Sequence, residues 1–257
     1  MFAKLLNRLQ ATRKNILLDL LAAKKTAWFS AATYSLSQAL TIAVEQNVRG
    51  RVLDCGAGLH QHRDLLAKNA DSYESIDWKA TEGLTYVGDV QSMDMIIDSR
   101  YDTVFCSQVL EHLSRPWDAL AEIFRVLKPG GRLLISAPHL SRLHEHPHDY
   151  FRYTAFGLKS LLENSGFQTI AIRHVGGLIT FLTHQISTIL LSSTWKIPLI
   201  RSVVFEFNQI ILIRFALWLD QKLPRNELFA VNYLAVAQRP AGGKPLIDQN
   251  WRTDGTN

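Results

Sequence analysis

The stretch from Arg51 to Gly58, RVLDCGAG, constrains the fold of this chain more than any other part of the sequence. It places an apolar strand directly before a turn of small residues, and a second strand ends on Asp77, nineteen residues after Gly58. Glycine is needed where a chain turns tightly into a helix and where a ligand approaches the backbone. A carboxylate at the end of the next strand can accept two hydrogen bonds from a ribose diol. The pattern therefore predicts an α/β fold with a site for a nucleoside-containing cofactor.

From residue 51 onward, short apolar strands alternate with helical segments. We expect strands at Arg51–Cys55, Tyr73–Asp77, Leu84–Val87, Tyr101–Ser107, Arg132–Ser136, Gln168–His174 and Asn232–Gln238. Leucine and isoleucine at helical spacing, and turn residues that end each run, predict helices at 3–23, 33–48, His60–Asn69, Pro116–Leu127, Thr154–Ser165, Leu178–Leu191 and Ile197–Leu219. Pro129, Gly130 and Gly131 are expected to break the helix before the fifth strand. Such alternation predicts a parallel sheet with right-handed crossovers.

Composition and charge narrow the class of protein. The chain has 257 residues, of which 47% are apolar and 20% charged, so it can bury a large core. Its net charge is only +5, but residues 1–25 carry six basic side chains against the single acid Asp19, which favours either an anionic partner surface or a solvated basic helix face. Cys55 and Cys106 both lie in strand-like contexts, so we expect no disulfide framework and a cytoplasmic location. We also expect no signal peptide and no spanning helix.

Four segments, in order, resemble the type-11 branch of the class I S-adenosylmethionine-dependent methyltransferases. They are VLDCGAG, the acid in ESIDW, the aspartate in VGDV, and FCSQVLEHLSRPWDALAEIFRVLKPGGRLLISAPH. The resemblance covers residues 48–175 and the final strand. It implies a Rossmann-like, seven-stranded, mostly parallel sheet whose last strand is antiparallel. A dinucleotide dehydrogenase shares the glycine turn but predicts neither LKPGG nor that last strand.

The resemblance implies S-adenosylmethionine as the cofactor and assigns the residues that bind it. Asp54, Gly56 and Gly58 match the loop beneath the methionine part, although His60 stands where family members usually have a third glycine. Asp77 matches the acid that binds the ribose hydroxyls. The other implied contacts are Trp78 against the adenine face, Asp89 and the Val90 amide at the adenine edge, and Ser107 at the end of the fourth strand, near the methyl group. The glycines could instead form only a tight turn, and Asp89 could cap a helix.

The segment SAPHLSRLHEHPHDYFRYT, residues 136–154, is expected to meet the acceptor substrate. It holds four of the nine histidines of the chain and looks like a loop found in type-11 members, often those encoded among bacterial surface-polysaccharide genes. We expect His144, Asp149, Arg152 and Tyr150 to bind the acceptor, because Arg152 offers a bidentate fork and the aromatic rings can stack on a sugar. His112 and His144 are the candidates for the base that removes a proton from the acceptor.

Other interpretations of the same histidine-rich segment stay open. A metal site could use His144, His146, His148 and Asp149, but alternate residues of an extended loop point to opposite sides, so we predict no metal. Asp149 could instead cap the following helix or pair with Arg152, with the aromatic residues in the core. His112 could simply pack in the LEHL turn.

The apolar segment 176–228 has no counterpart in the resemblance. It could be a lid over the substrate, a homodimer face, core, or a pair of helices that lie in a membrane surface. Trp195, Trp218 and the flanking basic residues fit peripheral membrane contact through residues 1–25 and 176–222. We therefore expect N-terminal amphipathic helices at 1–47, a cofactor-binding domain at 48–175 and 229–239, the apolar insertion at 176–228 and a loose tail at 240–257.

The sequence thus predicts a cytoplasmic methyltransferase that acts on a small polar or glycan-type acceptor, with a lipid-linked acceptor as one form. Two alternatives stay open: methylation of a quinone or lipid ring, and a catalytically silent protein that binds S-adenosylmethionine, which His60 suggests. Nucleic acid is not an expected partner. The fourth strand ends in Cys106, Ser107 and Gln108 rather than in the N/D-P-P-Y/F signature of amino-methylating enzymes, and the basic residues form no aromatic-interleaved stripe.

Overall fold

The computed structural model describes residues 12, 15–223 and 226–242. The chain divides into two compact units. We call them the helical unit, which comprises Met1–Ile42, Pro138–His146 and His174–Tyr233, and the sheet unit, which comprises Ala43–Ala137, Pro147–Arg173 and Leu234–Asn257.

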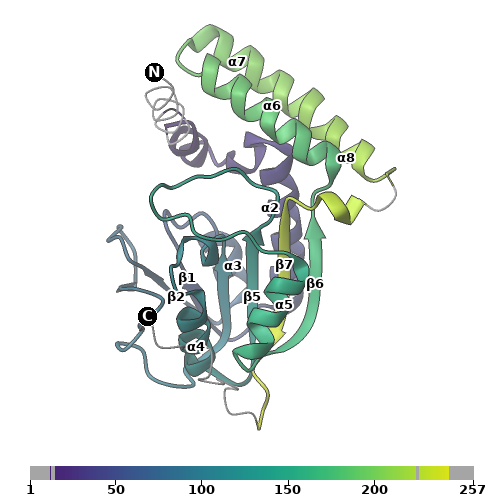
Figure 1. The fold of residues 1–257 in the computed structure, drawn as a ribbon. Helices are drawn as coiled ribbons and strands as arrows, with labels where there is room; N and C mark the ends of the chain where they lie inside the picture. Colours follow the sequence, from purple (N-terminus) through teal and green to yellow (C-terminus); the bar gives the residue numbers. More distant parts are fainter. Residues whose placement is uncertain (1–11, 13–14, 224–225, 243–257) are drawn as a thin grey trace, which may run out of the picture. The chain divides into compact units, whose positions relative to one another are not determined.

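Seven strands form one sheet in the order β3-β2-β1-β4-β5-β7-β6 (Figure 1). Their bounds are β1 Arg51–Cys55, β2 Ser72–Asp77, β3 Tyr86–Val87, β4 Tyr101–Ser107, β5 Leu127–Pro138, β6 Gln168–Val175 and β7 Asn232–Gln238. Strands β3, β2, β1, β4 and β5 are parallel, and the last strands are antiparallel. The predicted mixed seven-stranded sheet is therefore confirmed.

The register of the central strands places the predicted cofactor residues at one edge of the sheet. Cys55, the last residue of β1, lies opposite Ile76 of β2 and Cys106 of β4. Three neighbouring strands therefore end together. At this edge lie the glycine turn after β1, Asp77 as the last residue of β2 and Ser107 as the last residue of β4. Beyond the carboxyl ends of parallel strands is where open α/β sheets bind ligands. Cys55 and Cys106 are free and buried, as expected.

Helices α3 (Arg63–Asn69), α4 (Pro116–Val126) and α5 (Ala155–Asn164) connect the strands. Helix α4 begins with proline in its first turn, where the missing N–H costs nothing, and buries Leu120, Ile123 and Phe124 on one face. Thr154 caps α5, because its hydroxyl accepts a hydrogen bond from the Gly157 amide. Asp149 is therefore not the helix cap that was one of the alternatives.

Several element boundaries differ from the prediction, and those of β5, α3 and β3 bear on the site. Strand β5 begins at Leu127 and runs through Pro129–Gly131, with a register irregularity against β4 between Tyr101 and Thr103. The LKPGG segment is thus part of a strand and not a break before one. Helix α3 begins at Arg63 rather than His60, because His60 has a left-handed backbone (φ +57°) that a right-handed helix excludes. The third strand spans only Tyr86–Val87.

The helical unit contains helical residues 15–22, the 3₁₀ turn η1 (Thr26–Phe29), most of α2 (Ala31–Asn47), and α6 (Leu178–Thr194) packed against α7 (Pro198–Phe207) and α8 (Arg214–Asp220) (Figure 1). The predicted helix at 3–23 lies largely outside the described residues. A π-helical segment, η3 (Asn208–Ile213), joins α7 to α8. Ile16, Leu20, Phe29, Leu191, Trp195 and Phe205 form one apolar cluster of the unit. The continuous helix Pro198–Asp220 is long and apolar enough to cross a membrane by length and composition alone, a property that the expectation of no spanning helix, based on uninterrupted apolar runs, did not anticipate.

Candidate active site

Asp77 and the glycine turn are joined directly by hydrogen bonds. The Asp77 carboxylate accepts from the Gly58 amide at 2.9 Å through Oδ2 and from the Lys79 amide at 3.0 Å through Oδ1. The amides of Gly56 and Ala57 donate to the Ile76 carbonyl at the end of β2. These bonds hold the turn after β1 against the end of β2, so the two predicted cofactor elements form one rigid edge.

The two glycines of the turn have different reasons to be glycine. Both have left-handed backbones, with φ +74° at Gly56 and +53° at Gly58. A side chain at Gly56 would overlap Val109, whereas a Cβ at Gly58 would meet nothing within 4 Å. The backbone at Gly58 therefore borders open space, which a ligand that approaches this backbone closely would require. His60 also has a positive φ, a conformation that glycine adopts more readily than histidine.

Asp54 is a buried acid at the end of β1. Its carboxyl accepts a hydrogen bond from the Tyr73 hydroxyl at 2.9 Å. Burial raises the pKa of Asp54 to about 7, and the neighbouring charge of Asp77 adds to this effect against the opposing hydrogen bond from Tyr73. Asp54 therefore lies beneath the glycine turn as an acid that can be neutral near neutral pH.

The predicted adenine-side residues differ in how accessible they are. Trp78 is 60% exposed, with the Lys79 ammonium 4.4 Å from its ring centroid and the His148 ring 5.7 Å away. Val90 is buried. The exposed Asp89 carboxylate accepts hydrogen bonds from the backbone amide and side chain of Gln91, so it stabilises a turn in this structure. Trp78 is thus free to stack on a flat ring, while Asp89 would have to share its oxygens.

Ser107 ends β4 in a small polar cluster. Its hydroxyl lies 2.8 Å from the Ser136 hydroxyl, and the Gln108 side chain donates to Ser136 at 3.2 Å. Gln108 has φ +57°, a left-handed conformation that non-glycine residues rarely adopt. Strained backbone of this kind recurs at functional sites, where it fixes the direction of nearby groups.

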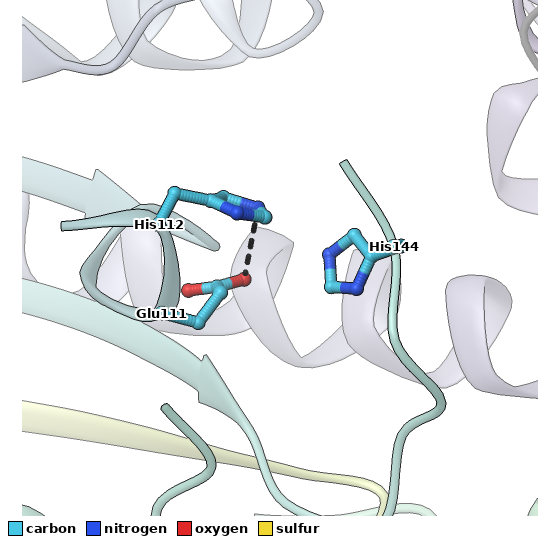
Figure 2. Close-up of side chains that lie close together, drawn as sticks. All are labelled: Glu111, His112 and His144. Atoms are coloured by element: carbon cyan, nitrogen blue, oxygen red, sulfur yellow. Dashed lines mark ion pairs between the residues drawn. The ribbon is translucent and has the colours of Figure 1, made fainter. Parts of the chain in front are cut away.

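The turn after β4 contains an acid that the sequence analysis did not select. Glu111 is completely buried, and neither carboxyl oxygen has a hydrogen-bond partner among the described residues. Figure 2 shows its carboxyl beside the His112 ring, with Oε1 3.7 Å from Nε2. Burial raises the pKa of Glu111 to about 8. The LEHL motif contains this acid next to the selected histidine, but nothing in the sequence indicates that its side chain points inward.

His112 is held in one tautomer. Its Nδ1 lies 2.6 Å from the carbonyl oxygen of His148. A carbonyl only accepts, so Nδ1 carries a proton, and in the neutral ring the lone pair is on Nε2, the atom that faces Glu111.

The segment after residue 147 is fastened to this turn. The Glu111 carbonyl accepts from the amides of Tyr150 and Phe151, and the Tyr153 hydroxyl donates to the Leu110 carbonyl at 3.2 Å. Arg152 makes a bidentate pair with the buried Asp149, at 2.6 and 2.9 Å. Two of the predicted acceptor-binding residues therefore bind each other, as the structural alternative held, while Tyr150 is 47% exposed.

His144 belongs to the helical unit, where its Nδ1 lies 3.3 Å from the Arg142 carbonyl oxygen. His146 belongs to the same unit, whereas His148 and Asp149 belong to the sheet unit. Neither unit by itself holds the four residues considered as metal ligands. His112 is thus the one candidate base that shares a unit with the glycine turn, Asp77 and Ser107.

Comparison with known proteins agrees with this geometry. Residues 53–135 match the family model described as a methyltransferase domain. A curated protein of Mycolicibacterium smegmatis, described as a probable S-adenosylmethionine-dependent methyltransferase, is 30% identical over 145 residues, which cover 49% of this chain and 56% of that protein. The chain thus spans little more than half the length of this curated relative.

Solved structures share the fold at low identity. A [4+2]-cyclase, SpnF, is 20% identical with a TM-score of 0.55, covering 80% of this chain and 82% of that one. A methyltransferase from Archaeoglobus fulgidus is 17% identical with a TM-score of 0.54, and the match covers 81% of this chain and 94% of that one. A Burkholderia thailandensis 1,6-didemethyltoxoflavin-N1-methyltransferase, solved with S-adenosylhomocysteine, is 16% identical with a TM-score of 0.52. The match covers 90% of this chain and 88% of that one. Together with the open space at Gly58, the family match identifies S-adenosylmethionine as the cofactor.

Proposed function

We propose that this chain methylates a small polar or glycan-type acceptor, which can be a lipid-linked one. Residues 53–135 form its class I S-adenosylmethionine-dependent methyltransferase domain. The observation that carries the proposal is the Gly58–Asp77 edge, with open space above Gly58 and an acid fixed at the end of β2. Free buried cysteines support a cytoplasmic location. When bound, the cofactor supplies an electrophilic methyl group on a positively charged sulfur.

The residues of the chain would bind and orient the cofactor and exclude water. Asp77 offers its remaining lone pairs to the ribose diol, and Trp78 offers an exposed ring face to the adenine. Ser107, Gln108 and Ser136 form a small polar wall at the end of β4. Holding both reactants in line in a site of this kind provides much of the catalysis in methyl transfer.

The turn after β4 would remove the proton from the acceptor. The lone pair of His112 Nε2 faces Glu111, and an ionised carboxylate there would repel it, which favours the neutral acid below about pH 8. Once Glu111 is ionised, the Glu111–His112 pair would accept the proton that the oxygen or nitrogen of the acceptor loses when it is methylated. The charged and titratable groups around Glu111 are His112, Cys106, Asp149, Arg152 and Tyr153.

The acceptor would lie against the segment 147–153. Tyr150 presents an exposed ring, and the backbone of this segment is fixed to the Glu111 carbonyl, so a stacked sugar would be held next to the proposed base. Arg152 is committed to Asp149, and this favours an uncharged hydroxyl-rich acceptor over one that needs a free guanidinium.

The test measures transfer of labelled methyl groups from S-adenosylmethionine to soluble glycans, lipid-linked sugars and quinone precursors as a function of pH. With an accepted substrate, we expect the wild-type rate to rise through pH 8, and Glu111→Gln to lower the rate above pH 8 by about 100-fold and to abolish the rise. Glu163→Gln on α5, paired only loosely with Lys159 at 3.8 Å, is the matched control and should keep the wild-type profile.

A second function, cofactor binding without turnover, is favoured by the bulky His60 at a glycine position. The [4+2]-cyclase with the same fold illustrates that such a fold does not by itself specify methyl transfer. Saturable cofactor binding with no methylated product from any acceptor class would favour this function over the proposed one. A pH profile that is unchanged in Glu111→Gln would contradict the role of the Glu111–His112 pair.

A further inference from the structure

Helices α6, α7 and α8 expose large apolar side chains on the surface of the helical unit. Examples are Ile186, Ile189, Leu199, Val203, Phe207 and Trp218, whose exposed fractions range from 47% to 84%. We call these six residues the apolar face. Single exposed apolar residues are ordinary on protein surfaces, but a contiguous set on neighbouring helices marks a surface that contacts something.

The buried side of α6 is mostly polar, with Leu191 as its one buried large apolar residue, whereas α7 buries Phe205 and α8 buries Ala216. Helix α6 buries Thr180, Thr183, His184, Ser187 and Ser192. His184 Nδ1 lies 2.8 Å from the Ser30 hydroxyl. The Ser187 hydroxyl donates to Asn208 Oδ1 at 2.6 Å. The Asn208 amide in turn donates to the carbonyls of Trp28 and Phe29, at 3.2 and 3.1 Å.

In α6 this arrangement inverts the usual polarity of a helix at a water-exposed surface. A helix of a water-soluble protein buries its apolar stripe and exposes its polar side. Helices in lipid do the opposite: small and polar residues form the contacts between helices, where their hydrogen bonds are satisfied, and apolar residues face the acyl chains. We propose that the apolar face of α6, α7 and α8 contacts the hydrocarbon of an anionic lipid bilayer.

Charge and aromatic residues support lipid as the occupant. The exposed Lys196 and Lys222 flank the helix Pro198–Asp220 at its two ends, where they can reach lipid phosphates. In α8, the rings of Phe215 and Trp218 lie 5.9 Å apart, and tryptophan is enriched at the boundary between headgroups and acyl chains.

The helices lie in the plane of the membrane in this proposal. The length of Pro198–Asp220 would allow it to span a bilayer, but Arg201, Glu206 and Arg214 fall within it. Charged residues at the bilayer centre are costly, whereas at the surface long side chains can reach water while the apolar face sinks into the acyl boundary. This orientation is also compatible with a cytoplasmic catalytic unit.

The test is flotation of the full chain with vesicles of phosphatidylcholine, with and without phosphatidylglycerol. The variant Ile186→Ser, Leu199→Ser and Val203→Ser removes exposed side chains only. The control is Ile170→Ser, Phe156→Ser and Ile97→Ser, three positions on the sheet unit. The replaced side chains are equally exposed in the two triple mutants: 50%, 84% and 69% in the variant, and 50%, 84% and 68% in the control. Because three apolar side chains are lost from the lipid, we expect the partition coefficient of the variant to fall by at least about tenfold.

Binding of wild type and control to the anionic vesicles, lost or strongly reduced in the variant, supports the proposal. Quenching of Trp218 fluorescence by brominated lipids, absent in Trp218→Phe, would place the same face in the acyl region. Equal flotation of variant and control overturns it. The proposal is also overturned if the wild type does not float and forms a dimer in analytical ultracentrifugation, while the variant is a monomer. The apolar face would then pair two copies of the chain. Neither outcome depends on methyl transfer.

Discussion

Asp77→Ala is the sharpest single perturbation of the cofactor site. In the structure the carboxylate already accepts the Gly58 and Lys79 amides, at 2.9 and 3.0 Å, and it is 8% exposed. Hydrogen bonds to charged groups contribute about 1.5–3 kcal/mol each. The alanine variant loses the two expected bonds to the ribose and also the bond that shapes the turn at Gly58. We therefore expect a loss of about 3 kcal/mol in binding, which is about 150-fold in Kd.

The assay is calorimetric titration of S-adenosylhomocysteine. Asp71→Ala, the same substitution at an exposed position before the other end of β2, is the control and should bind like the wild type. Asp77→Asn retains one acceptor oxygen and should be intermediate. Circular dichroism and urea denaturation must show that the variant is folded. If folded Asp77→Ala binds within about threefold of the wild type, well below one hydrogen bond's worth, then the carboxylate does not hold the ribose and the reasoning is refuted.

Two further predictions concern the same edge of the sheet. Gly56→Ala should lower the unfolding free energy by more than about 3 kcal/mol, because its methyl group overlaps Val109. Gly58→Ala should lower it by only about 1 kcal/mol but should bind the cofactor at least about tenfold more weakly. Equal binding by folded Gly58→Ala would show that the open space is not where the cofactor binds. Because the pKa of Asp54 in the folded protein is about 7, above its usual value of 3.8, its stabilising contribution is present below pH 4 and is lost as the pH rises to 7. The unfolding free energy of the cofactor-free protein should fall by about 4 kcal/mol across that range relative to Asp54→Asn, and parallel urea-denaturation curves for the two proteins would contradict this.

The sequence was sufficient to predict most of the sheet because strand order and hydrophobic runs carry strong local signals. The bounds of β1, β4 and β7 agree with the predicted ranges residue for residue. The error at β5 has a physical cause. Proline and glycine normally end elements, but here Gly130 has φ +78°. Its amide donates to the Arg239 carbonyl just after β7, and the Arg239 amide donates to the Gly131 carbonyl, so the chain stays in the sheet through an irregularity.

The candidate site was harder to predict, because its chemistry depends on which way side chains point. Spacing placed Gly58 and Asp77 at the ends of neighbouring parallel strands, and the structure adds that the Gly58 amide donates directly to the Asp77 carboxylate. Spacing could not indicate that Asp149 and Arg152 bind each other or that Glu111 is completely buried. Burial of one acid in a turn depends on packing from segments far apart in the sequence, and a single sequence contains no direct record of it.

The helical unit shows a further limit of reading hydrophobic periodicity. The spacing of apolar residues in α6 indicates a helix with an apolar side, and the usual inference puts that side inside. In the structure, Ser187 and Asn208 are buried against each other, and Ile186 and Ile189 are exposed. A buried amide or hydroxyl without a partner costs more than an exposed isoleucine, so the hydrogen-bonded pair determines the inner side once Asn208 can reach the Trp28 and Phe29 carbonyls. The apolar residues are then left outside, where they need a low-dielectric environment rather than water, and this requirement connects the fold of this unit to the proposed lipid contact.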